Sequence, residues 1–105
     1  MDRKKAIVKK LKHFKSELDG AIGVEKMIFF GSWAKGKQRK HSDIDLIIVS
    51  KKFEGKRFRY RPLGFYNYWN LNYPVDFLCY TPEEFKKLSK RITIVKEAVN
   101  EGVVI

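Results

Sequence analysis

The segment Ile44-Asp45-Leu46-Ile47-Ile48-Val49 carries the strongest structural signal in the chain. Apart from Asp45 it is a continuous apolar run, which is typical of a β-strand covered on both faces. Residues 24–30 and 75–80 are two further short apolar segments, and both are predicted to be strands. We therefore expect a small β-sheet at the centre of the molecule.

Helical patterns flank these strands. Residues 2–19 repeat apolar side chains at helical spacing with lysines on the other face, and Gly20 and Gly23 are the expected end of this helix. Thr81-Pro82-Glu83-Glu84 is a capping box with proline at the first helical position, so a second helix is expected to start there, with a break near Ser89. This order of elements predicts an α/β (α+β) fold in which helices flank a small mixed sheet.

Length and charge restrict the class of protein. The 105 residues suit a single domain, expected to span residues 1–105. Lys and Arg number 23 against 12 Asp and Glu, and the formal net charge of +11 favours polyanionic partners: nucleotide phosphates, nucleic acid or an acidic protein surface. Cys79 is the only cysteine, which excludes an internal disulfide and a cysteine-based zinc cluster. The sequence has neither a membrane-spanning run nor a signal-peptide core, so we expect a cytoplasmic protein without membrane contact.

Three aspartates are the first candidate site. Side chains alternate along a strand, so Asp43 and Asp45 face the same side, about 6.5–7 Å apart along the backbone. A divalent cation between them would relieve their repulsion, and oxygen ligands suit Mg²⁺. Asp76 lies within a third apolar strand, where a carboxylate must be paired, protonated or metal-bound. A frayed strand end for Asp43 and a salt bridge to a lysine for Asp76 are the alternatives to a metal site.

Gly31-Ser32 is the second candidate site, because it falls where the first strand ends. A glycine there allows the backbone to approach a ligand closely, and the following N–H groups with the Ser32 hydroxyl can hold phosphate oxygens. Residues 32–42 are polar and are predicted to be a loop with one helical turn; its basic side chains add positive charge: Lys35, Lys37, Arg39 and Lys40. The alternative is an ordinary turn with a serine cap.

These signals together resemble a known family signature. Gly31-Ser32-Trp33-Ala34-Lys35-Gly36, five residues, and then Ser42-Asp43-Ile44-Asp45-Leu46 are similar to the nucleotidyltransferase superfamily of the DNA polymerase β type. The size of the chain, residues 75–85 and Glu101-Gly102 resemble its minimal nucleotidyltransferases (MNT), which include antitoxin-like proteins. The resemblance covers nearly the whole chain and is weakest at residues 53–73. Two departures concern specificity rather than chemistry: Lys35 stands where arginine is frequent, and Trp33 is bulky.

The resemblance implies a polymerase-β-type nucleotidyltransferase fold and Mg²⁺-dependent transfer of AMP from ATP. In this pattern Asp43 and Asp45 would hold two Mg²⁺ ions, and Asp76 would share one of them. Four residues would bind the nucleotide: Gly31, Ser32, Lys35 and Ser42. The resemblance further implies an antitoxin-like protein that pairs with a HEPN-domain toxin and modifies a hydroxyl side chain of that partner.

Residues 53–73 hold many aromatic and basic side chains, and we expect an exposed basic stretch leading into an aromatic helix near residues 63–70. Such a segment can stack on bases, but it is more often the apolar seam of a covering helix or a protein interface. Two alternatives to the enzyme stay open: a module that sequesters the toxin without catalysis, and a basic RNA-binding domain. The oligomeric state stays open as well.

Overall fold

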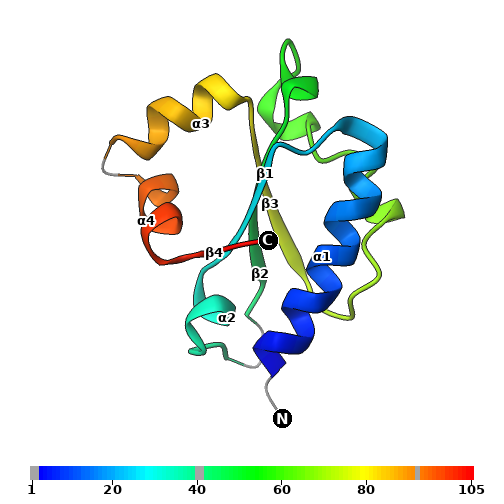
Figure 1. Ribbon diagram of the computed structural model, residues 1–105, viewed down its shortest axis with the longest axis vertical. Helices are drawn as coiled ribbons and strands as arrows, with labels where there is room; N and C mark the ends of the chain where they lie inside the picture. The colour runs from blue at the N-terminus through cyan, green and yellow to red at the C-terminus, as the bar shows by residue number, and fades with distance from the viewer. Residues whose placement is uncertain (1–2, 40–41, 92) are drawn as a thin grey trace.

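The computed structural model describes residues 3–39, 42–91 and 93–105, and helices lie on both sides of its four-stranded sheet (Figure 1). Two predictions concern residues that the structure does not describe: the start of the first helix at residue 2 and the contribution of Lys40 to the basic loop. The strand order is β3-β2-β1-β4. The strands are β1 (Lys26–Phe30), β2 (Ile44–Val49), β3 (Val75–Tyr80) and β4 (Val103–Val104). β2 and β3 are parallel, whereas β1 is antiparallel to both β2 and β4, so the predicted mixed sheet is confirmed.

Two helical layers explain why β2 is apolar along its length. α1 (Arg3–Ile22) covers one face of the sheet, and α3 (Pro82–Ser89) and α4 (Ile94–Glu101) cover the other (Figure 1). The α1 side is filled by the helix stripe and alternate strand residues: Ile7, Leu11, Phe14, Leu18, Phe29, Leu46, Ile48 and Phe77. The other side is filled by the intervening residues and α4: Ile28, Phe30, Ile47, Val49, Val95 and Ala98.

The first helix ends later than predicted. α1 continues through Gly20 to Ile22, and the chain then turns at Gly23, whose φ is +71°. A glycine within a helix costs about 1 kcal/mol relative to alanine, but the fully buried Leu18 holds this part of α1 on the sheet. The side chain of Asp19 accepts a hydrogen bond from the backbone of Val24 at 2.6 Å and fixes the turn. Tertiary packing therefore outweighs the local glycine signal.

The C-terminal helices follow the prediction closely. The Thr81 hydroxyl accepts a hydrogen bond from the Glu84 backbone at 3.2 Å, and the Thr81 backbone donates to the Glu84 carboxylate at 2.9 Å, which confirms the capping box. The break near Ser89 is also confirmed, because α3 ends there and Thr93 caps α4. β4 was not predicted; it is a two-residue strand that pairs with β1.

The predicted aromatic helix near residues 63–70 is wrong. This region contains short 3-10 turns, at Lys51–Phe53, Phe58–Tyr60 and Phe65–Asn67. Gly64 has a φ of +90°, outside the right-handed helical region, so a continuous helix cannot run through residues 63–70. The aromatic side chains instead cover the sheet next to α1: the rings of Phe65 and Trp69 lie 5.4 and 5.7 Å from the ring of Phe77.

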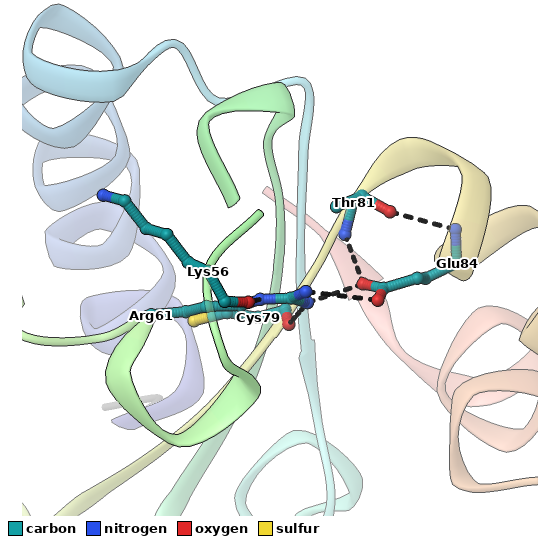
Figure 2. Close-up of polar contacts among 5 residues, drawn as sticks. All are labelled: Lys56, Arg61, Cys79, Thr81 and Glu84. Carbon is teal, nitrogen blue, oxygen red and sulfur yellow. Dashed lines mark hydrogen bonds and ion pairs between the residues drawn. The ribbon is translucent and has the colours of Figure 1, made fainter. Parts of the chain in front are cut away.

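One member of the predicted exposed basic stretch, Arg61, is buried, with 7% of its side chain exposed. Figure 2 shows its polar contacts. Its guanidinium pairs with the Glu84 carboxylate through both terminal nitrogens and donates to the carbonyls of Cys79 and Lys56 at 3.0 Å. These bonds tie residues 53–73 to the first turn of α3. The hydrogen bond from Arg61 also lowers the pKa of Glu84. Arg61 is therefore part of the scaffold.

α2 (Ser32–Lys35) is the single helical turn predicted after the first strand. Its Trp33 side chain is buried in the core on the α1 side. None of the helices in the described ranges is long and apolar enough to cross a membrane.

Candidate active site

The candidate site lies at one end of the sheet, where β1 ends and β2 and β3 begin. The register pairs Phe30, the last residue of β1, with Asp45, and pairs Asp45 with Asp76 on β3. Paired residues on neighbouring strands point to the same face of a sheet. Asp45 and Asp76 therefore face the side covered by α3 and α4, and Asp43 lies two residues before Asp45. The register places Asp45 and Asp76 side by side, whereas Asp43 precedes the first paired residue of β2, so the predicted meeting of all three aspartates stays a prediction.

The pKa of Asp45 reflects both its burial and its acidic neighbours. Its pKa is raised to about 6, first because the side chain is partly buried and then because of the negative charges of Asp76 and Asp43. None of the three aspartates forms an ion pair with a basic side chain of the described residues. The salt bridge considered as an alternative for Asp76 is therefore not seen there. Within the described residues, no ion pair offsets the negative charge of these three side chains.

The backbone at Gly31 is fitted around Asp45. Gly31 has φ +84° and ψ −162°, a conformation that side chains other than glycine rarely adopt. A Cβ at this position would lie 3.1 Å from Cγ of Asp45 and well inside contact distance of its Oδ2. The Gly31-Ser32 turn and the carboxylate thus belong to one site. In the structure the group that Gly31 approaches is the Asp45 side chain, and the predicted approach to a ligand stays a prediction.

Ser42 closes the loop that joins α2 to β2. Its hydroxyl accepts a hydrogen bond from the Arg39 backbone at 2.7 Å, and its carbonyl accepts one from Nε1 of Trp33 at 3.0 Å. The Trp33 ring also packs against Tyr73, with ring centroids 4.9 Å apart. The bulky tryptophan therefore holds α2 beside the start of β2, directly before Asp43. Ser42 therefore contributes to the site indirectly, because its carbonyl accepts the Trp33 hydrogen bond that positions α2.

Lys35 turns toward α4. Its Nζ lies 3.1 Å from Oε1 of Glu97 and 2.9 Å from Oε2 of Glu101, and these hydrogen bonds, that of Glu101 first, raise the pKa of Lys35. The two glutamates are one helical turn apart on the same helix. The sequence did not predict either glutamate as a partner of Lys35, and Glu101 entered only through the family resemblance.

The fold and this end of the sheet together define a nucleotidyltransferase domain. Residues 7–100 match the family model described as "Nucleotidyltransferase domain", and the chain belongs to this family. Its structure is similar to the crystal structure of a candidate nucleotidyltransferase from Sulfolobus solfataricus, with a TM-score of 0.66 and 22% sequence identity over 96% of this chain and 80% of the other. At this identity the likeness concerns the fold. Among curated proteins, none matches the sequence significantly.

The donor set at the site fits a divalent metal in its chemistry. Nucleotidyltransferase domains generally use a nucleoside triphosphate and a divalent metal. Asp43, Asp45 and Asp76 offer the hard oxygen ligands that Mg²⁺ prefers, and a bound cation would relieve the repulsion that Asp43 and Asp76 exert on Asp45. Among the described residues no group of three or more His, Cys, Asp or Glu side chains is already placed to hold a metal ion. Ligation by all three would require the carboxylates to draw together.

Proposed function

We propose that this nucleotidyltransferase is Mg²⁺-dependent and transfers AMP from ATP to a hydroxyl side chain of a partner protein, a HEPN-domain toxin. The observation that carries the catalytic part is the group of three aspartates, without ion-pair partners in the described chain, against the Gly31-Ser32 turn. Such a group has the charge and the ligand atoms for a cation and a triphosphate. The minimal-nucleotidyltransferase resemblance of residues 75–85 and Glu101-Gly102 supports the partner.

In this proposal Asp43, Asp45 and Asp76 would hold Mg²⁺, with two ions expected. The metal would supply charge neutralisation at the triphosphate and a lowered pKa of the acceptor hydroxyl. The hydroxyl oxygen forms a bond to the α-phosphorus of ATP as the bond from that phosphorus to the bridging oxygen breaks, and pyrophosphate leaves. The protein contributes mainly by positioning these groups and supplying charge.

The nucleotide would lie along the Gly31-Ser32 turn. The backbone N–H groups after Gly31 and the Ser32 hydroxyl would hold the β- and γ-phosphates. Lys35 is proposed to neutralise the leaving pyrophosphate, for which it would have to exchange its present partners, Glu97 and Glu101, for phosphate oxygens. Ser42 would keep the turn in place through Trp33.

The test uses the purified chain, radiolabelled ATP, Mg²⁺ and a purified HEPN-domain partner. We expect label on the partner, which is lost in the Asp43→Ala/Asp45→Ala variant and retained in Glu54→Ala. Glu54 is an exposed acidic residue that follows the other end of β2. Labelled CTP, GTP and UTP measure the nucleotide preference. Absence of label, or equal label from the aspartate variant, would reject the catalytic proposal.

Co-expression separates catalysis from sequestration. If transfer of AMP neutralises the toxin, cells that express the toxin with the Asp43→Ala/Asp45→Ala variant should stop growing, whereas cells with the unmodified chain should grow. Growth with both versions would show that the chain acts by binding its partner. A pull-down of the toxin by both versions controls for loss of the complex.

A further inference from the structure

α1 carries a cationic surface that the proposed reaction does not use. Its N-terminal part, from Arg3 to Ser16, contains no acidic residue, and the first acidic residue of the helix is Glu17. Five exposed basic residues lie here, Arg3, Lys5, Lys9, Lys10 and Lys12, and three of them, Lys5, Lys9 and Lys12, are three or four positions apart on one side of the helix and form what we name the α1 cationic face. None of the five forms an ion pair within the described residues, whereas Lys35, Lys51 and Lys87 each do.

This face opposes the stability of its own helix. Like charges three and four residues apart, such as Lys5, Lys9 and Lys12, repel one another along a helix by roughly 0.2–0.5 kcal/mol per pair. The first turn of α1 has no acidic residue, although negative charge is what the N-terminal end of a helix favours. The buried stripe of α1 accounts for its packing on the sheet. The cationic face is therefore best explained by an anionic partner.

The composition of the face distinguishes between kinds of anionic partner. α1 contributes none of the large apolar side chains that are exposed in the described part of the chain. Protein interfaces need a desolvated aromatic or aliphatic centre and are depleted in lysine. Interfaces with the phosphate backbone of nucleic acids are strongly basic and hydrated, and lysine suits them as a mobile point charge. Nucleic acid fits this face better than an acidic protein.

The shape of the surface agrees with an extended ligand. One hollow on α1 is lined by lysines on both sides of Val8, and a second is lined by Lys9, Lys10, His13 and Asn70, so Lys9 stands between the two. Lys5 and Lys12 are about 10 Å apart along the helix axis at a rise of 1.5 Å per residue. That distance corresponds to about three phosphate spacings along one strand of a duplex.

We propose that the α1 cationic face binds the phosphodiester backbone of nucleic acid without reading its sequence. Lysine side chains offer no planar pair of donors to a base edge, so they position a strand but do not select it. α1 runs antiparallel to β1, and its N-terminal end lies at the end of the molecule where α2 and the starts of β2 and β3 lie (Figure 1). Nucleic acid on this face would lie on the side of the sheet opposite to Asp45 and Asp76, which face α3 and α4. The binding does not depend on nucleotidyl transfer.

The experiment measures the affinity of the full chain for fluorescent 20-nucleotide RNAs of two unrelated sequences by anisotropy, at several salt concentrations, with EDTA and without ATP. We expect equal affinity for the two sequences and a slope of log K against log salt of roughly −2 to −3, as for three or four phosphate contacts on a single strand. Lys5→Glu/Lys9→Glu/Lys12→Glu should weaken binding at least tenfold and reduce the slope by about 2.

A matched variant controls for net charge. Lys52→Glu/Lys86→Glu/Lys90→Glu changes the charge equally at exposed lysines elsewhere and should weaken binding less than threefold. Equal losses in the two triple variants would overturn the proposal, as would RNA binding that is absent at 50 mM salt. If the α1 glutamate variant does not melt cooperatively, glutamine replaces lysine at the same three positions. The glutamine variant is expected to lose less RNA affinity than the glutamate variant.

Two further ligands identify the source of the phosphate and test the rival partner. Duplex DNA of the same length is compared with the RNA, and tighter binding of either supports the proposal and names its source. A polyglutamate peptide should bind much more weakly than RNA at the same salt. If it binds as tightly and depends on the same three lysines, the nucleic-acid proposal is wrong and the face belongs to an acidic protein. Asp43→Ala/Asp45→Ala should bind RNA at least as well as the unmodified chain, whatever the outcome of the transfer assay.

Discussion

Gly31→Ala tests the site at its tightest point. The φ of +84° and ψ of −162° at Gly31 fall in a region that is essentially restricted to glycine, where another residue costs about 1–3 kcal/mol. The added methyl group would also overlap the Asp45 carboxylate, whose Cγ would be 3.1 Å away. That carboxylate is the end of a flexible side chain, so it can turn aside at little further cost. The variant should therefore fold, with Asp45 displaced.

The two consequences are measured separately. Urea denaturation should show a loss of about 1–3 kcal/mol in the free energy of unfolding, which leaves most of the 5–15 kcal/mol typical of a domain. Transfer activity should fall by about 100-fold, because a displacement of about 1 Å at a reacting group has that effect. Gly36→Ala is the matched control: Gly36 ends α2 with φ +73°, but its Cβ would meet open space.

The control variant should lose about 1–2 kcal/mol of stability, the cost of a left-handed conformation, and keep most of its activity. The reasoning depends on the contrast in activity between two variants of similar stability. If Gly31→Ala keeps the activity of Gly36→Ala although both are destabilised, the contact between Gly31 and Asp45 has no role in the reaction. If Gly31→Ala is as stable as the unmodified chain, the backbone conformation described for Gly31 is wrong.

Three further results are expected. The pKa of Asp45 is raised from 3.8 to about 6 in the folded chain, so the folded state binds this proton more tightly than the unfolded state does. In EDTA the free energy of unfolding should therefore fall as pH rises from 4 to 6. Asp45→Asn should flatten this pH dependence in urea titrations. Glu97→Gln/Glu101→Gln releases Lys35 and should lower KM for ATP roughly two- to fivefold in steady-state kinetics, the effect of one exposed ion pair. Arg61→Met removes a buried guanidinium from four hydrogen bonds and should lower the free energy of unfolding by about 2–4 kcal/mol in urea denaturation.

The sequence predicts those parts of the fold that depend on local patterns. The apolar run of β2 marks a strand between two layers, and the Thr81 capping box marks the start of α3, because each depends on neighbouring residues alone. The end of α1 depends on contacts from elsewhere: Leu18 is held by the core, so the helix passes Gly20. β4 is too short to show a strand pattern and exists because β1 offers it an edge.

The candidate site likewise has residues that the sequence pattern predicts and residues that it does not. Asp45 and the Gly31-Ser32 turn are recognisable from spacing, because β1 and β2 are consecutive and pair directly. The partners of Lys35 could not be predicted, because Glu97 lies 62 positions further along the chain and reaches Lys35 only through the packing of α4. The aromatic segment misleads for a related reason. Its path depends on long-range contacts of Arg61 and on the positive φ of Gly64, which the sequence pattern does not show.

One property of β2 joins the stability of the fold to the chemistry of the site. Alternation along β2 places Ile44 and Leu46 under α1 and Asp45 with Ile47 on the face of α3 and α4. Asp45 therefore shares a face with the core, which is why its burial contributes most to its raised pKa. A ligand that relieves this charge binds the folded chain alone, so it must also stabilise that chain by mass action. Mg²⁺ should accordingly raise the melting temperature of the unmodified protein more than that of Asp45→Asn, even when no acceptor is present.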